Sequence, residues 1–439
     1  MTTAPANRLL PDLGARIWLL VLVNCMANTG SGLILPFLIV YLHNARGIPL
    51  DHAGLLLAII GAAGIAATPL AGVLADRIGA RLTFATGELL FMVATAAFIP
   101  VTSFTQAIAP ALASGVAGGL TWSGLYVMLG EGVPSARRSD AFGISYALAN
   151  VGVGIGALIG GFVIDAASPH SFVYLFVGDA ISNLLFAAVL FAMSDAPAEA
   201  VAPTAPSARD PMRAPLRGYR NVLGDRGLLA VLLVNTLLVT LATSQMTSGF
   251  PAWVTGPARS TPRVVGAAFA ANTVTLVVAQ LFVLRLIRSR RRTDAAAVGA
   301  LAFALAWLLA LAGGHTGGGT TAAVALIGAL VVIAIGESLV APTLPAIVND
   351  LAPTAVRGRY NAVFTLSWQV GPVIGPALAG LLLGESRGNE LLLFLAAGCL
   401  AVAAIVPSLR RWVPEKADIA TSAWFPPRQT RDASQFPSR

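Results

Sequence analysis

Residues 53–101 read AGLLLAIIGAAGIAATPLAGVLADRIGARLTFATGELLFMVATAAFIPV, which is two long apolar runs on either side of a short charged turn. Each run has about 20 residues, enough for a helix to cross a hydrocarbon layer of about 30 Å. Similar runs recur along the whole chain of 439 residues, of which 56% are hydrophobic and 11% are charged. Soluble domains carry about 25% charged residues. The pattern therefore indicates a membrane protein, and because backbone groups in lipid must be paired within each span, an all-α bundle.

Twelve apolar runs are expected to be transmembrane helices. They cover 17–41, 53–72, 82–101, 106–130, 140–164, 171–193, 228–253, 265–287, 295–313, 321–346, 360–383 and 390–408. Residues 194–226 carry five prolines among many alanines, and they are expected to form a linker between two sets of six spans. Residues 410–439 are polar and are expected to form a disordered tail.

The basic residues predict how the chain is oriented. With the N-terminus inside, residues 1–16, the connections after even-numbered spans with the span ends beside them, and the tail hold 24 of the 28 Lys and Arg residues. Lys and Arg gather on the cytoplasmic side of membrane proteins, so both termini and the linker are expected in the cytoplasm, and the spans in the plasma membrane. The net charge of +8 follows from these loops, so no nucleic acid is expected as a partner.

The chain repeats itself with an offset of 219 residues. The pairs that this offset aligns are Glu131 with Asp350, Pro134 with Pro353, Arg138 with Arg357, Asn150 with Gln369, Gly152 with Gly371, Gly156 with Gly375, and Gly161 with Gly380. Such a repeat predicts two pseudo-symmetric six-helix halves, residues 17–193 and 227–409. Proteins with parallel repeats place their binding site at the interface of the halves, near the middle of the membrane.

The turn between the second and third spans reads Gly72-Val-Leu-Ala-Asp76-Arg77-Ile-Gly79-Ala-Arg81. Its glycines allow a tight turn at the membrane surface, and Asp76 can pair with a cation or cap a helix. An ordinary charged turn is the alternative. In letters and in position the turn resembles the signature loop of the major facilitator superfamily, G-x-L-a-D-r-x-G-r-k. The resemblance extends over residues 17–408. It implies a transporter in which Asp76, Arg77 and Arg81 latch this side between conformations.

Two spans carry a glycine pattern. The fifth has Gly152-x-x-x-Gly156-Ala157-x-x-Gly160-Gly161, and the eleventh has Gly371-x-x-x-Gly375-Pro376-x-x-Ala379-Gly380. Small residues at this spacing let helices pack closely in lipid. The pattern also resembles G-x-x-x-G-P-x-x-G-G of the drug-antiporter branch of the superfamily, which implies export, although Ala157 replaces the proline in the first copy. Ser114 stands where that branch has a buried Arg, so proton coupling must use other residues or differ in kind.

Carboxyl groups inside the membrane are functional candidates, because a charge there costs about 3 kcal/mol or more. Glu337 lies in the middle of the tenth span, which the resemblance places beside a central cavity. A carboxyl group shielded from water favours its protonated form, so Glu337 can carry a coupling proton. A hydrogen bond between helices is the alternative role. Asp179 is the second candidate, although the resemblance places its helix at the periphery. Glu88 is expected to reach the surface or pair with loop arginines, and Asp165 to reach water.

Polar and aromatic side chains form stripes on three further spans, and these are candidates for contact with a substrate. Asn24 and Asn28 share a face of the first span, Thr240 and Thr243 belong to a threonine stripe on the seventh, and the fourth adds Trp122 and Tyr126. Such faces can equally hold helices together. The aromatic residues favour a ligand that is partly apolar.

The sequence contains no pattern typical of an enzyme. Its four histidines lie in or beside outer loops without metal-ligand spacing, and there is no phosphate-binding Gly-Lys-Ser/Thr loop. No catalytic residue, metal or cofactor is therefore expected. The sequence predicts a monomeric secondary transporter that uses protons to export small lipophilic or cationic compounds such as drugs. The alternatives are uptake or export of a metabolite or sugar by the same fold, and a membrane receptor that transports nothing.

Overall fold

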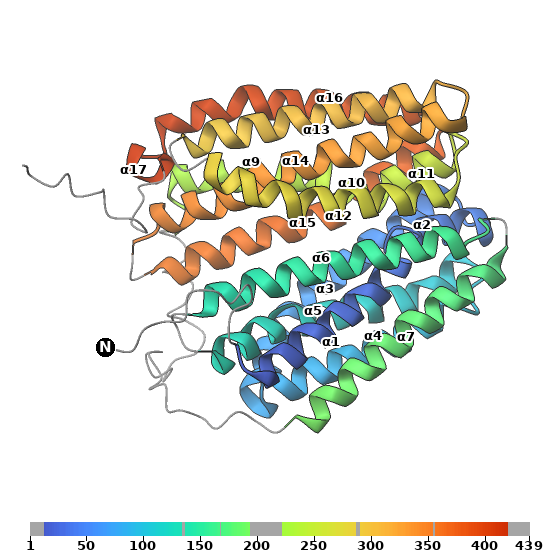
Figure 1. The fold of residues 1–439 in the computed structure, drawn as a ribbon, viewed down its shortest axis with the longest axis horizontal. Coiled ribbons are helices and arrows are strands. Elements are labelled where there is room, and N and C mark those ends of the chain that lie inside the picture. The colour runs from blue at the N-terminus through green and yellow to red at the C-terminus, as the bar shows by residue number, and fades with distance from the viewer. Residues whose placement is uncertain are drawn as a thin grey trace, which may run out of the picture.

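The computed structural model of the chain describes residues 13–133, 137–166, 168–193, 222–286, 290–353 and 356–419. Over these residues the secondary structure is helical, with a single isolated bridge between Arg291 and Ile419. The helices run side by side along the long axis of the molecule (Figure 1). This is the all-α bundle that the apolar runs predict. The greater part of the predicted linker, residues 194–221, lies outside the described residues.

The helices reproduce the order of the predicted spans. In the first part of the chain they are α1 (Ala15–Ile34), α2 (Leu38–Val40), the π-helix η1 (Tyr41–Ala45), α3 (Leu50–Ile78), α4 (Ala80–Phe98), α5 (Phe104–Gly132), α6 (Arg138–Val163) and α7 (Pro169–Ala192). In the second part they are α9 (Arg226–Leu238), the π-helix η3 (Val239–Thr243), α10 (Ser244–Met246), α11 (Gly249–Thr255), α12 (Pro262–Leu286), α13 (Arg292–Gly314), α14 (Gly319–Leu351), α15 (Arg357–Gly384), α16 (Gly388–Ile405), the 3-10 helix η6 (Val406–Arg411) and α17 (Glu415–Asp418).

Eleven helical segments of the described residues are long and apolar enough to cross a membrane. The fourth predicted span corresponds to α5, a helix of 29 residues that is not among the eleven. The count of twelve spans therefore stays a prediction. Most of the helices extend a few residues beyond the apolar runs, as α3 does at both ends.

Two predicted spans are interrupted. α1 ends at Ile34, and Pro36 follows, whose ring lacks an N–H group and clashes with the carbonyl one turn earlier. The chain then continues through α2 into the π-helix η1. In the seventh predicted span, α9 passes into the π-helix η3 and α10, and α11 starts afresh with Pro251 in its first turn. A proline is tolerated there because the first N–H groups of a helix have no intrahelical partner.

The helices form two bundles. In Figure 1, α1 and α3–α7 lie in the lower part of the molecule and α9–α17 in the upper part. α1 packs on α6 and α7, and α4 packs on α5 and α7, while α14 packs on α12 and α13 in the other bundle. The bundles meet mainly through α3 with α15 and α6 with α12, and the short helices α2 and α11 also touch at the far end.

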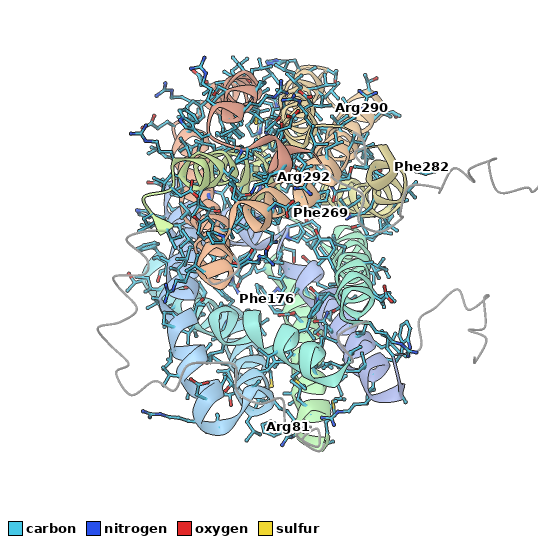
Figure 2. The ribbon with its side chains drawn as sticks, turned by 90° about the vertical axis from the view of Figure 1, so that its left-hand side faces the viewer. Arg81, Phe176, Phe269, Phe282, Arg290 and Arg292 are labelled. Carbon is cyan, nitrogen blue, oxygen red and sulfur yellow. The ribbon has the colours of Figure 1, made fainter. Side chains whose placement is uncertain are left out.

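Arginines gather at one end of the molecule, which we call the Arg-rich end. Figure 2 looks at this end and places Arg81 in the lower bundle and Arg290 and Arg292 in the upper one. The opposite end, called the far end below, carries α2 and α11 (Figure 1).

The expectation of a disordered tail from Arg410 onward is wrong for residues 410–419. η6 continues to Arg411, and α17 follows, with Ala417 and Asp418 buried. Asp418 accepts hydrogen bonds from the backbone N–H (2.8 Å) and hydroxyl (3.0 Å) of Thr293 at the start of α13. These tertiary contacts order a segment whose composition is polar.

Candidate functional site

A cavity of about 330 Å³ lies inside the first bundle. Side chains of α1, α4, α5, α6 and α7 line it, and they include four amides, one carboxyl group and three phenylalanine rings: Asn24, Asn28, Asn150, Asn183, Glu88, Phe84, Phe91 and Phe186. Sites for small molecules in proteins have volumes of about 300–1,000 Å³, an apolar lining and a few polar groups. The cavity has the size and the lining of such a site.

Of the predicted contact residues, the cavity brings together Asn24 and Asn28. They are four residues apart on α1, and the Asn28 amide nitrogen donates to the Asn24 carbonyl oxygen at 2.8 Å and to its side-chain oxygen at 3.2 Å. The side chains of Trp122 and Tyr126 lie outside the described part of the structure, although Thr121 of α5 lines the cavity.

Thr240 and Thr243 lie in the other bundle, within the π-helix η3. The hydroxyl oxygen of Thr240 has no hydrogen-bond partner among the described residues, whereas its backbone carbonyl accepts from the amide of Gln245 at 3.3 Å. The amide nitrogen of Gln245 also donates to the carbonyl of Gly375 at 3.0 Å and so ties α10 to α15. The threonine stripe and the two asparagines therefore belong to two separate places in the fold.

Glu88 is a cavity residue that the sequence analysis placed elsewhere. The expectation that it reaches the surface or pairs with loop arginines is wrong, because its side chain is 5% exposed and lines the cavity. Arg81, about 10 Å away along the same helix, instead donates to the backbone carbonyl of Leu190 at 2.8 Å. The guanidinium group thus donates a hydrogen bond to the last turn of α7, where the backbone carbonyl groups have no N–H partner within the helix.

Asp179 faces the interior of the bundle from α7. Thr95 donates to its Oδ2 at 2.8 Å, Asn183 is a second hydrogen-bond partner, and the side chain is 4% exposed. Its Oδ1 has no hydrogen-bond partner among the described residues. A Cβ added at Gly30 of α1 would lie 2.8 Å from this oxygen, so the glycine lets α1 approach Asp179 closely. Asp179 is thus enclosed by α1, α4 and α7, and it interacts electrostatically with Glu88.

Glu337 lies on α14 in the second bundle, and its partner is in the first. The hydroxyl group of Tyr146, on α6, is hydrogen-bonded to the Glu337 carboxyl group. Tyr146 also lines the cavity that contains Glu88. Nearby, the Thr273 hydroxyl of α12 donates to the carbonyl of Asn150 on α6 at 3.3 Å. The structure therefore places Glu337 at a contact between the two bundles, next to one wall of the cavity.

The turn Gly72–Arg81 lies at the Arg-rich end. Gly79 ends α3 and starts α4 with a φ of +88°, a conformation that is strained for residues with a side chain. Gly72, Asp76 and Arg77 are exposed, and among the described residues no ion pair of Asp76 is found. Of the charged residues of this turn, Arg81 is hydrogen-bonded to another helix, through the backbone carbonyl of Leu190 in α7. A latch made by Asp76 and Arg77 therefore remains a prediction.

The glycine patterns lie where helices touch. A Cβ at Gly152, Gly156 or Gly160 of α6 would collide with α1 or with Phe37 just after it, and one at Gly371 or Gly375 of α15 with η3 or α10. The last glycine of each pattern faces the opposite bundle. A Cβ on Gly161 would lie 3.0 Å from the Cα of Gly266 in α12, and one on Gly380 would lie 2.9 Å from the Cα of Gly54 in α3. The backbone carbonyl oxygen of Pro376 also lies against Gly54, where a Cβ on that glycine would collide with it.

Comparison with known proteins identifies the class of the chain. A family model described as Major Facilitator Superfamily matches residues 17–259 and 255–434. With its apolar helices, the chain is therefore a multi-pass membrane transporter. It belongs to the major facilitator superfamily.

Two relatives are informative. The MFS-type transporter YttB of Bacillus subtilis (strain 168) is 24% identical over 386 residues, which cover 84% of this chain and 88% of that protein. The quinolone resistance protein NorA of Staphylococcus aureus (strain MRSA252) is 30% identical over 149 residues, which cover 34% of this chain and 38% of NorA.

Solved structures with the same fold include transporters of different cargo. A POT family transporter in complex with a thioalcohol-conjugated peptide has a TM-score of 0.76 and 16% identity over 92% of this chain and 99% of its own. The nucleoside transporter NupG has a TM-score of 0.71 and 13% identity over 91% of this chain and 100% of its own. At these identities the likeness establishes the fold alone.

Proposed function

We propose that the protein is a proton-coupled exporter of small lipophilic or cationic compounds such as drugs. Residues 17–193 and 227–409 act as two halves that rock about a central site, and residues 194–226 link them. The protein works as a monomer in the plasma membrane with both termini in the cytoplasm. It uses the proton gradient as its energy source and performs transport rather than enzymatic turnover.

The observation that carries this proposal is the bond between Tyr146 and Glu337, because it joins a titratable group in one bundle to the other bundle. A charged carboxylate accepts a stronger hydrogen bond than a protonated one. Binding of a proton to Glu337 therefore weakens this contact between the halves, and release of the proton restores it. Proton binding is thereby linked to the relative position of the halves, which is what coupling requires.

The contacts between the bundles support alternating access. Those made by Gly54 with Gly380 and by Gly161 with Gly266 involve the far-end parts of α3, α15, α6 and α12. Because these contacts hold the two bundles together at the far end, the bundles can separate at the Arg-rich end. The distribution of basic residues assigns that end to the cytoplasm.

Two observations favour the export of drugs. The name of NorA, which matches about a third of the chain, refers to quinolone resistance. The glycine patterns of α6 and α15 resemble those of drug antiporters. Asp179 is the second candidate for a proton carrier, since Thr95 and Asn183 hold it inside the first bundle.

A polar metabolite is the second candidate for the cargo. Four asparagine side chains line the cavity, and amides pair well with hydroxyl groups. This lining is more polar than the sequence suggests, since it includes Asn150 and Asn183 in addition to the α1 stripe.

Flux into everted membrane vesicles tests the proposal. A lumen more acidic than the medium is expected to drive uptake of ethidium by the wild type. Glu337→Gln is expected to reduce this uptake by about tenfold or more, while exchange of ethidium without a gradient continues. Glu385→Gln, a change of an exposed acid in the loop after α15, serves as the matched control.

The results separate the alternatives. Uptake by Glu337→Gln at the wild-type rate would refute the role of Glu337. A wild type that moves nucleosides, peptides or sugars but no lipophilic compound would establish the second candidate. A wild type whose expression raises accumulation of every tested drug in whole cells would refute export.

A further inference from the structure

The cavity of the first bundle is an acidic site without basic side chains. Glu88 lines it, Asp179 lies close to Glu88, and none of the lining residues is Arg, Lys or His. The segments of the surrounding helices that cross the membrane, residues 17–42, 82–133, 139–163 and 171–192, contain no Arg, Lys or His either. Within these segments and among the lining residues, the two carboxyl groups therefore have no basic side chain.

Among the described residues, no hydrogen bond or ion pair to the carboxyl group of Glu88 is present, although the side chain is only 5% exposed. Asp179, in contrast, is held by Thr95 and Asn183. An enclosed carboxylate without a partner is unfavourable, and a cation in the cavity would supply the missing interaction.

The remaining walls suit an organic cation. Asn28 uses its amide nitrogen on Asn24, so its side-chain oxygen is left as an acceptor. Phe84 and Phe186 meet edge to face with centroids 5.0 Å apart, and both rings line the cavity together with Phe91. The faces of aromatic rings attract cations, and a volume of about 330 Å³ admits a small organic molecule. A metal ion alone would make no use of the aromatic rings, so this lining favours an organic cation.

We propose that this cavity binds a small organic cation, with Glu88 as its counter-ion. The cationic nitrogen lies against the Glu88 carboxylate, the oxygen of Asn28 accepts a hydrogen bond, and Phe84 and Phe91 cover the apolar part. The negative charge of Asp179, which lies close to Glu88, adds to the attraction of the cation. This assignment names the substrate class of the proposed exporter and so depends on that function, but it concerns a residue and a site that proton coupling at Glu337 does not require.

Binding to the purified protein in lipid nanodiscs tests the assignment without any gradient or flux. The wild type is expected to bind ethidium, a monovalent aromatic cation, and the neutral compound chloramphenicol. Glu88→Gln is expected to weaken ethidium binding by about tenfold or more and to leave chloramphenicol within about twofold, because only the cation loses an ionic partner. Glu88→Asp keeps the charge and is expected to retain most of the affinity. Glu390→Gln, at an exposed position at the start of α16, makes the same chemical change far from the cavity.

A gain of affinity provides a second test, which does not depend on how Glu88→Gln folds. Asn28→Asp adds a carboxylate to the same wall and is expected to tighten ethidium binding by about tenfold. Equal affinity of the wild type and Glu88→Gln for ethidium would overturn the assignment and leave the exporter proposal intact. Loss of proton-driven transport in Glu88→Gln with unchanged ethidium affinity would also overturn the assignment, because Glu88 would then carry protons instead of binding the cation. A wild type that binds neither compound would overturn the exporter proposal and the assignment with it.

Discussion

Tyr146 takes part in both candidate sites, because its side chain lines the cavity of the first bundle and its hydroxyl group bonds to Glu337 of the second. A ligand in the cavity and a proton on Glu337 therefore act on the same side chain. In a coupled transporter the two must influence each other by the same free energy in both directions. Tyr146 gives that influence a direct physical route, since one side chain contacts both sites.

Tyr146→Phe removes the hydroxyl group and keeps the ring. We expect proton-driven transport of ethidium to fall by about tenfold, which corresponds to a hydrogen bond of about 1.4 kcal/mol. Ethidium binding is expected to stay within about twofold, since the ring still closes the cavity. Rates in everted vesicles and affinities in nanodiscs measure the two effects.

The matched control for this change is Tyr174→Phe, since Tyr174 on α7 is 73% exposed. Unchanged coupling in Tyr146→Phe would show that the contact between Tyr146 and Glu337 is not used in transport.

Sequence reasoning proposed Glu337 and Asp179 as proton carriers, which stays a prediction, and it misplaced Glu88. A carboxyl group in an apolar run is conspicuous, and this signal found all three. The depth of Glu88, two turns from the end of its span, suggested a path to the surface. Whether a side chain points outward depends on the rotation of its helix against its neighbours, and this is decided by tertiary packing. The surrounding spans contain no basic residue that could pair with Glu88. This was the signal that could have indicated an orientation toward the interior.

At the scale of elements, the interrupted helices show what a single sequence can and cannot predict. The spans 17–41 and 228–253 were predicted as continuous, although each contains a proline near its interruption, Pro36 and Pro251. Proline alone does not predict a break here, because Pro69 lies inside the continuous helix α3. Nothing in the letters of Val239–Thr243 marks a π-helix, because its formation depends on contacts with α15, where Gly371 admits Val239 and Thr240. Similarly, polarity predicted a disordered tail, whereas contacts with the start of α13 order α17.

Asp418→Ala tests the attachment of α17. The side chain is 1% exposed, accepts two hydrogen bonds from Thr293, and lies 3.9 Å from the guanidinium groups of Arg291 and Arg410. Its removal leaves the backbone N–H of Thr293 buried without a partner. We expect the free energy of unfolding to fall by about 2 kcal/mol, which a lower thermal midpoint of the purified protein would report.

Glu415→Ala is the matched control on the same helix. Its side chain is 72% exposed and pairs with Arg291 at 3.3 Å. Exposed ion pairs contribute between about 0 and 1 kcal/mol, so this variant is expected to melt close to the wild type. Equal midpoints for the two variants would contradict an anchoring role for Asp418.

At the scale of the whole molecule, the 219-residue repeat predicted which helices correspond to each other. It did not predict which helices meet across the bundles, because a repeat relates positions within the halves and carries no information on their contact. That contact is made mainly by α3 with α15 and by α6 with α12, and glycines bring the backbones close together there.

A cross-link at the far end tests whether the bundles separate there during transport. A Cβ on Gly384 of α15 would lie 3.6 Å from the Cβ of Asp51 in α3, a separation that suits a disulfide. With Cys25 and Cys399 replaced by serine, Asp51→Cys combined with Gly384→Cys is expected to oxidise readily. Ethidium transport should then stop, and a reductant should restore it.

Each single cysteine variant serves as a control for this cross-link and is expected to keep its activity under oxidation. Full transport by the oxidised double variant would mean that the far end stays closed throughout the cycle, which contradicts alternating access by rocking of the halves.

The paired glycines have a geometric consequence. Gly54 and Gly266 are each the fifth residue of their helix, α3 and α12, and each meets the last glycine of the pattern on α15 or α6. At these two pairs backbone lies against backbone, with no long side chain between the helices. The bundles can therefore close tightly at the far end and part there again without any rearrangement of side chains at these glycines.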